Sequence, residues 1–143
     1  MCLTVGPHIL VSESKGQRMV EPTKKKILIV DDTKDIGELL AVLFRLRGCE
    51  PILATDGRQA VDRAARYVPD LVLMDICMPV MDGYQATRRI HDIPYLSRVP
   101  VVAMSAHWDH DWSALAIDAG CEECISKPLK LESIDQIISR YVH

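Results

Sequence analysis

The stretch Ile27-Leu28-Ile29-Val30-Asp31-Asp32 begins a pattern that three later stretches repeat: a short apolar run followed directly by a chemically active side chain. Runs this short, separated by helix-length amphipathic segments, are typical of buried parallel strands. Ligands of an open α/β sheet bind outside the carboxyl ends of its strands. We therefore expect the side chains that follow the four runs to converge in one pocket: Asp31, Asp32, Asp75, Ser105 and Lys127.

The segments between these runs complete a regular alternation of strands and helices. Strands are predicted at 27–31, 50–54, 70–75, 99–104 and 123–126, and helices at about 34–47, 57–67, 83–91, 109–119 and 131–142. Pro51 indicates that the second strand lies at a sheet edge. With right-handed crossovers, the predicted fold is a (βα)5 doubly wound parallel sheet of the flavodoxin-like class, with strand order 2-1-3-4-5. The apolar stripe predicted for the first helix is Ile36, Leu39, Leu40, Leu43 and Phe44.

Length and charge limit the possible classes of protein. A chain of 143 residues is enough for one domain. Residues 1–24 lack helical or strand periodicity and are predicted to form a flexible extension, followed by a domain over 25–143. The net charge is −3, but residues 1–26 carry +3, which leaves −6 for the rest and argues against nucleic acid as a partner.

Apolar runs and cysteines predict the compartment. The longest uninterrupted apolar run, 39–44, is far too short to insert into a membrane. Five cysteines without regular spacing are typical of reduced thiols, so we expect a cytoplasmic location.

The cluster of active side chains predicts a specific chemistry. Three carboxylates at neighbouring strand ends repel one another unless protons or a cation offset their charge, and Mg²⁺ is the cation that oxygen ligands of this kind favour. An alternative for Asp31 and Asp32 is that they cap the helix that begins near Lys34. Lys127 and Ser105 supply an ammonium and a hydroxyl for phosphoryl oxygens, which makes Asp75 a candidate nucleophile and an aspartyl phosphate the expected intermediate.

With these residues in view, the chain resembles the response-regulator receiver domains, the CheY-like family of two-component signalling. The resemblance rests on residues 27–32, on Asp75 within Leu73 to Gly83, on Ser105-Ala106 and on Lys127-Pro128-Leu129. It implies that Asp75 accepts a phosphoryl group from a phosphohistidine of a histidine kinase or a histidine phosphotransfer protein. The protein would then be a signalling phosphoacceptor rather than an enzyme, although it assists its own phosphorylation and dephosphorylation.

The resemblance also implies ligands for the cation and a route for the signal. Mg²⁺ would be held by Asp32, Asp75 and the backbone carbonyl of Cys77, with Asp31 acting through water, and the Lys127-Pro128 bond would be cis. In the family, phosphorylation moves the hydroxyl at the position of Ser105 and shifts an equilibrium on the face formed by the fourth helix, fifth strand and fifth helix. A downstream protein would bind that face.

Several positions depart from the family or tune it. Cys124 stands three residues before Lys127, where the family usually has Tyr or Phe, so the aromatic part of the switch is missing. His107 and Cys77 occupy positions where the family varies its residue to tune the lifetime of the phosphoryl group. Cys121 and Cys124 form a CxxC, for which we expect buried, reduced thiols rather than a redox or zinc site.

Three alternatives to a working receiver remain open at this stage. A haloacid-dehalogenase-like phosphatase would need a second Asp where this chain has Cys77. A flavodoxin-like FMN binder would need a phosphate loop after the first strand, which this sequence lacks. A degenerate receiver would act as a phosphorylation-independent interaction module. The chain ends within a turn of its last predicted helix, so we expect a stand-alone receiver that binds another protein or passes the phosphoryl group onward, and that does not bind DNA.

Overall fold

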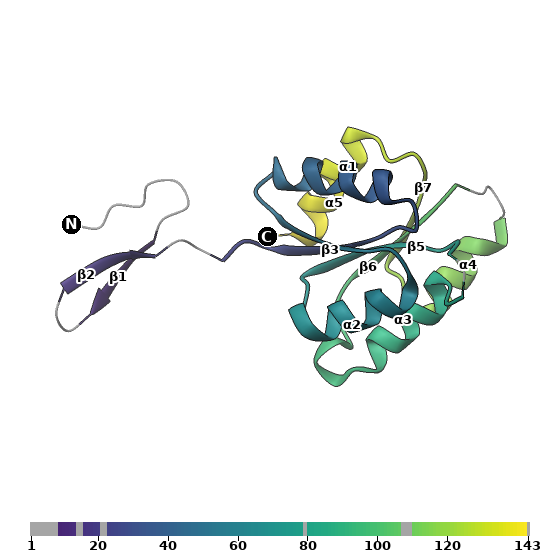
Figure 1. The fold of residues 1–143 in the computed structure, drawn as a ribbon, viewed down its shortest axis with the longest axis horizontal. Helices are drawn as coiled ribbons and strands as arrows, with labels where there is room; N and C mark the ends of the chain where they lie inside the picture. Colours follow the sequence, from purple (N-terminus) through teal and green to yellow (C-terminus); the bar gives the residue numbers. More distant parts are fainter. Residues whose placement is uncertain (1–8, 14–15, 21–22, 79, 107–109, 143) are drawn as a thin grey trace.

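The computed structural model describes residues 9–13, 16–20, 23–78, 80–106 and 110–142. Its main sheet is parallel and has the order β4-β3-β5-β6-β7, which is the predicted order 2-1-3-4-5. Helices α1 and α5 cover one face of this sheet, and α2, α3 and α4 cover the other (Figure 1). The strands are β3 (Lys26–Val30), β4 (Glu50–Ala54), β5 (Leu71–Asp75), β6 (Val101–Ser105) and β7 (Glu123–Ser126). The helices are α1 (Lys34–Arg45), α2 (Gly57–Tyr67), α3 (Gly83–Asp92), α4 (His110–Ala119) and α5 (Leu131–Tyr141), with a 3-10 turn η1 at Pro94–Leu96.

A second, antiparallel sheet precedes the domain. It pairs β1 (Ile9–Glu13) with β2 (Gly16–Val20), and Ile9 lies opposite Val20. This hairpin lies within the segment for which the sequence predicts a flexible extension. Two runs of five residues are too short to establish a strand period among Gly, Ser and charged residues. The domain boundary near residue 24 stays a prediction.

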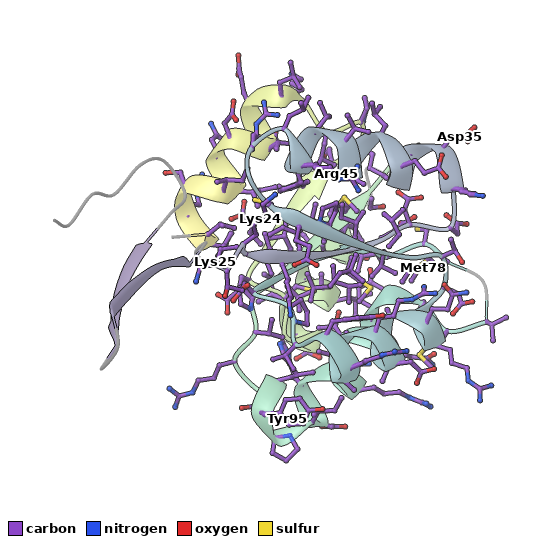
Figure 2. All side chains as sticks on the ribbon, turned by 60° about the vertical axis from the view of Figure 1, so that its left-hand side comes forward. Lys24, Lys25, Asp35, Arg45, Met78 and Tyr95 are labelled. Atoms are coloured by element: carbon purple, nitrogen blue, oxygen red, sulfur yellow. The ribbon has the colours of Figure 1, made fainter. Side chains whose placement is uncertain are left out.

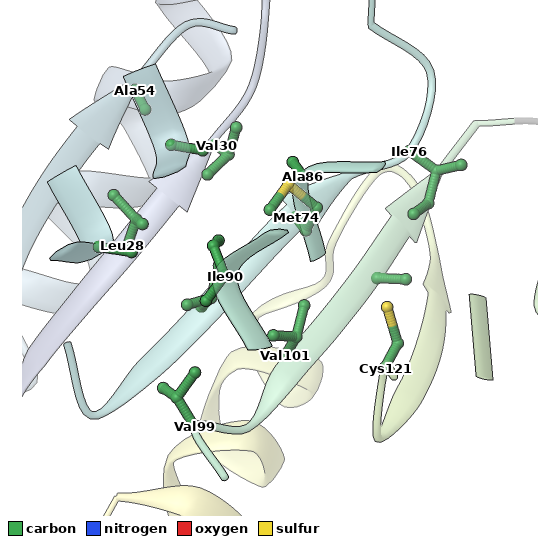
Figure 3. Packing of buried hydrophobic residues seen from close by; sticks show 14 of the residues in the cluster. Leu28, Val30, Ala54, Met74, Ile76, Ala86, Ile90, Val99, Val101 and Cys121 are labelled. Carbon is green, nitrogen blue, oxygen red and sulfur yellow. The ribbon is translucent and has the colours of Figure 1, made fainter. Parts of the chain in front are cut away.

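The core is built by the alternation of side chains along the buried strands. In β3, Leu28 and Val30 face the side of α2 and α3, while Ile27 and Ile29 face α1 and α5. Figure 3 shows the first of these layers, in which strand side chains pack against Ala86 and Ile90 of α3. All of β5 is buried. Since both faces of the central strands are packed, the positions of their carboxyl ends are fixed by the core.

The outward face of α1 differs from the prediction. Leu40 and Phe44 are buried as expected, but Ile36 and Leu39 are 39% and 59% exposed. Their place on the buried face is taken by Gly37 and by Ala41 of the same helix. Small residues allow the helix to approach the sheet closely, and the larger apolar side chains are left at the surface.

Two further expectations can be compared with the structure. Pro51 lies in β4, which pairs only with β3 and is an edge strand, as its proline predicts. Among the residues that the structure describes, no helix combines the length and the apolar character needed to cross a membrane.

Candidate functional site

The parallel register brings the predicted side chains to one edge of the sheet. Val30 lies opposite Met74, and Asp75 lies opposite Met104, so the residues that follow β3 and end β5 and β6 meet at the same level. Asp31, Asp75 and Ser105 are all buried, with exposed fractions of 1%, 4% and 1%. Asp32 is exposed at the mouth of the site. The convergence expected from the sequence is therefore present.

Lys127, which follows the last residue of β7, contacts the acidic cluster. Its Nζ donates to Asp31 Oδ2 at 2.5 Å and to Asp75 Oδ2 at 3.4 Å. Burial alone lowers the pKa of the Lys127 ammonium, but the bond to Asp31 and the charges of both carboxylates outweigh burial and leave that pKa raised. The ammonium thus stays charged and offsets one of the neighbouring carboxylates.

Asp75 is the most perturbed carboxyl of the cluster. Burial raises the pKa of Asp75 to about 6, the charge of Lys127 opposes that rise, and the charge of Asp31 adds to it. Its Oδ1 accepts a hydrogen bond of 3.1 Å from the backbone N–H of Cys77. A carboxylate that is buried and only partly compensated gains from a further cation.

The donor set fits a hard divalent cation. One carboxylate oxygen from each of Asp31, Asp32 and Asp75 lies within 4.8 Å of the others. Carboxylate oxygens with an open side for water are the ligands that Mg²⁺ prefers. The alternative that Asp31 and Asp32 cap α1 is wrong, because Thr33 is the N-cap residue. Asp31 instead accepts a local hydrogen bond of 2.9 Å from the N–H of Thr33.

The loop after Asp75 is held by a glycine. A Cβ on Gly83 would lie 2.5 Å from the carbonyl oxygen of Asp75 and 2.8 Å from the Cα of Ile76. The N–H of Gly83 also donates to the carbonyl of Ile76 at 3.1 Å. Only glycine allows this approach, so the first turn of α3 is packed directly beneath the candidate nucleophile.

The remaining predicted residues surround this centre. Cys77 is exposed, and its Sγ lies 3.9 Å from Ser105 Oγ, which places both at the rim. The Lys127-Pro128 bond is cis, as expected. His107 lies outside the described residues. The structure thus brings Asp31, Asp32, Ser105, Cys77 and Lys127 together around Asp75, whereas Cys124 lies in β7 against α4.

The two cysteines of the CxxC motif do not lie at the N-terminus of a helix, where thiolates are activated: Cys121 is buried and Cys124 is half-buried. Cys121 Sγ contacts Thr87 Oγ1, and Cys124 Sγ donates to the carbonyl of Ser113 in α4 at 3.7 Å. Burial raises the pKa of Cys121 to about 11 and also raises that of Cys124. Both are free cysteines, which agrees with the expected reduced thiols.

One part of the site was missed by the sequence analysis. A groove of about 480 Å³ opens beside Asp75. The Ile36 and Leu39 side chains, assigned to the core from their spacing, line it together with Leu43, Pro128 and Leu129. Helical periodicity does not show how much of an apolar stripe is buried in the core and how much is exposed beside it. The large number of apolar positions on α1 was nevertheless a signal that some of them lie at the surface.

Comparisons with known proteins define the family. The profile of the response regulator receiver domain matches residues 27–139. The polar-differentiation response regulator DivK of Brucella anthropi is 32% identical over 118 residues, which cover 82% of this chain and 96% of DivK. The chain belongs to the response regulator receiver domain family. It is homologous to the phosphoacceptor domains of response regulators and histidine kinases, which supports a role in a two-component phosphorelay.

Other relatives are larger proteins or isolated receiver domains. The regulatory protein AtoC of Escherichia coli is 36% identical over 115 residues, but the chain spans only 24% of AtoC. It also spans 4% of the hybrid signal transduction histidine kinase G of Dictyostelium discoideum. The receiver domain of the Pseudomonas aeruginosa sensor histidine kinase PA1611, solved with a magnesium ion in its active site cleft, is 33% identical with a TM-score of 0.77, and the match covers 83% of this chain and 98% of that domain.

Proposed function

We propose that Asp75 is the phosphoacceptor of this domain. The observation that carries the proposal is the contact of one ammonium, Lys127, with both Asp31 and Asp75 at the end of the buried central strand. A carboxylate oxygen of Asp75 would form a bond to phosphorus while the bond from phosphorus to a histidine nitrogen of the donor breaks. Lys127 and the Ser105 hydroxyl would bind oxygens of the transferred group.

Mg²⁺ is the proposed cofactor. Asp32, Asp75 and the backbone carbonyl of Cys77 would hold it, and Asp31 would contribute through water. When bound, the cation supplies positive charge that lowers the repulsion between the carboxylate and the incoming phosphoryl group. The donor set of the three aspartates supports this assignment, as does the magnesium described in the PA1611 receiver domain.

The groove beside Asp75 favours a protein as the donor. Ile36 and Leu39 are exposed on α1, and Leu129 lines the same groove. An apolar surface of this kind next to a charged centre suits the side chains of a docking helix better than it suits a small polar molecule. We therefore infer that a histidine kinase or histidine phosphotransfer protein places its phosphohistidine over Asp75 while it contacts α1.

We also propose that the downstream partner binds the face formed by α4, β7 and α5. Leu115 and Ile117 of α4 and Leu131 of α5 are 50%, 52% and 57% exposed. Lys127 follows β7 directly, so a change at the acidic centre reaches this face through a single strand. The free cysteines of the described residues support a reducing, cytoplasmic compartment for these partners.

The test is intact-mass analysis after incubation with acetyl phosphate, with and without Mg²⁺. We expect a mass increase of one phosphoryl group that requires Mg²⁺ and is lost in Asp75→Ala. Asp118→Ala is the matched control, because Asp118 is an exposed carboxylate whose ion pair is with Arg88 on the surface.

Two results would contradict the proposal. An adduct that persists in Asp75→Ala would place the phosphoacceptor elsewhere. The absence of an adduct from folded protein, repeated with a phosphorylated histidine kinase, would favour a phosphorylation-independent interaction module.

A further inference from the structure

The arginines of α2 and α3 form a basic surface on an acidic domain. These two helices lie side by side on one face of the sheet (Figure 1). They hold only two aspartates, Asp62 and Asp92, although residues 27–143 as a whole carry a net charge of −6. Figure 2 shows long side chains with nitrogen tips that extend outward from this side of the domain. The arginines are Arg58, Arg63, Arg66, Arg88 and Arg89.

Four of these five arginines have no carboxylate partner among the described residues, whereas two arginines on the opposite side of the sheet do. On the α1 and α5 side, Arg47 bonds Asp135 at 2.5 Å and Arg140 bonds Glu123 at 2.7 Å. On α2 and α3, one ion pair joins Arg88 to Asp118 at 3.7 Å, and the other four arginines make no ion pair with any described residue. Arg63 donates to the side-chain oxygen of Gln59, and Arg66 lies over the ring of Tyr67. Guanidinium groups bind carboxylates bidentately, so Arg58 and Arg89 are the arginines best placed to bind an external carboxylate.

Two of these arginines line a hollow that reaches the candidate phosphoacceptor site. Arg58 and Arg89 line a cavity of about 770 Å³ together with Asp32 and with Val80 and Met81 of the loop after β5. Val80 is fully exposed. The hollow therefore offers two guanidinium groups and an exposed apolar side chain at one edge of the acidic cluster, and the carboxylate of Asp56 also lines it.

The walls of this hollow are held in place by close backbone packing. A Cβ on Gly57, the first residue of α2, would lie 2.6 Å from the carbonyl oxygen of Met81. Asp56 caps α2 by accepting from the N–H of Gln59 at 2.7 Å, which fixes its carboxylate at the start of the helix. A preformed site loses less conformational entropy on binding than a mobile one.

We propose that the α2–α3 surface is a second docking site, separate from the α4–β7–α5 face, and that it binds an acidic protein segment. Carboxylates of the segment would pair with Arg58 and Arg89 in the hollow, and an apolar side chain beside them would contact Val80. Asp62 and Asp92, interspersed among the arginines, would repel the uniform charge of a nucleic-acid backbone. A protein segment can place a cation or a neutral residue opposite them.

The test is a titration of the whole isotope-labelled chain with a short synthetic peptide rich in Asp and Glu that contains two Leu. Backbone amide shifts in the NMR spectrum locate the binding site. We expect shifts on α2, α3 and Val80, and about tenfold weaker binding in the Arg58→Glu/Arg89→Glu double variant. Arg45→Glu is the matched control, because Arg45 is an exposed arginine on the other side of the sheet that makes no ion pair with a described residue (Figure 2).

Three results would overturn the proposal. These are equal weakening in the control variant, shifts centred outside α2 and α3, and tighter binding of a single-stranded oligonucleotide of the same net charge. Phosphorylation by acetyl phosphate at saturating Mg²⁺ is measured in parallel and should still occur in the double variant, because Asp75 and its partner Lys127 are untouched. The phosphorylation measurement tests the proposed phosphoacceptor and the peptide titration tests the proposed docking site, so the two proposals can fail independently.

Discussion

The carboxyl end of β5 and the body of β7 differ in how tightly the surrounding structure constrains them. Every residue of β5 is buried, and Asp75 is held by a backbone hydrogen bond and by Lys127. Every residue of β7 is only half-buried, and Cys124 fills its position with a small side chain. The charged centre thus has little freedom to vary, whereas the strand that would transmit its state is open to substitution.

Lys127 joins these two regions, and its removal should have the largest effect. Lys127→Met leaves the buried carboxylate of Asp31 without its cation. We expect a loss of about 3 kcal/mol in the free energy of unfolding at pH 7 without Mg²⁺. Urea denaturation measures this loss, and added Mg²⁺ should recover part of it. Lys130→Met, at an exposed position three residues later, should change stability by less than about 0.5 kcal/mol. Equal effects in the two variants would show that the ion pairs contribute nothing.

The packing beneath Asp75 can be tested with a pair of glycines. Gly83→Ala places a methyl group against the backbone of Asp75 and Ile76, so we expect a loss of about 2 kcal/mol. Gly37→Ala on α1 meets only Leu53, at 3.7 Å, and should stabilise the protein by up to about 1 kcal/mol because alanine favours the helix. Thermal denaturation of both variants checks the contrast. A stable Gly83→Ala would mean that the loop can move away from β5.

The sequence predicts the tightly packed end of β5 better than it predicts the more open parts of the molecule, α1 and β7. The end of β5 was predictable, because buried strands give continuous apolar runs and the reactive side chains follow them directly. The outward position of Ile36 and Leu39 was not, because it depends on how closely Gly37 lets α1 approach the sheet. The sequence also does not predict whether Cys124 transmits a signal, because transmission depends on how Cys124 packs against α4.

The charge of Asp75 predicts a specific pH dependence. Its pKa is about 6 in the folded protein and near 3.8 in the unfolded chain, so the folded state holds the extra proton between these values. Stability should therefore fall as pH rises from about 4 to 6 and stay lowered above that range. Asp75→Asn removes this penalty, and we expect a gain of about 1 to 2 kcal/mol at pH 7 without Mg²⁺.

The pH dependence is measured by urea denaturation of Asp75→Asn and the unsubstituted protein at pH 7 and pH 3.5, with a chelator present. The two proteins should differ little at the lower pH, where Asp75 is protonated in the folded state and largely protonated in the unfolded chain. Asp118→Asn serves as the control, because its side chain is 80% exposed. A gain that is the same at both pH values would assign the effect to packing and not to charge.

The smallest expected effect concerns Cys124, the position of β7 at which the sequence is predicted to depart from the family. Cys124→Tyr adds a ring where the thiol now donates to the carbonyl of Ser113, so we expect a loss of about 1 kcal/mol and a displacement of α4. If the aromatic residue restores a missing part of the switch, phosphorylation should change the amide NMR shifts of α4 and α5 more in the variant than in the unsubstituted protein. The affinity of the phosphorylated form for its downstream partner should change as well.

Cys121→Ser, a substitution in the same CxxC, should leave that response unchanged. If Cys124→Tyr also leaves it unchanged, the open packing of β7 has no role in the switch, and the signal must travel from Asp75 through Ser105 alone.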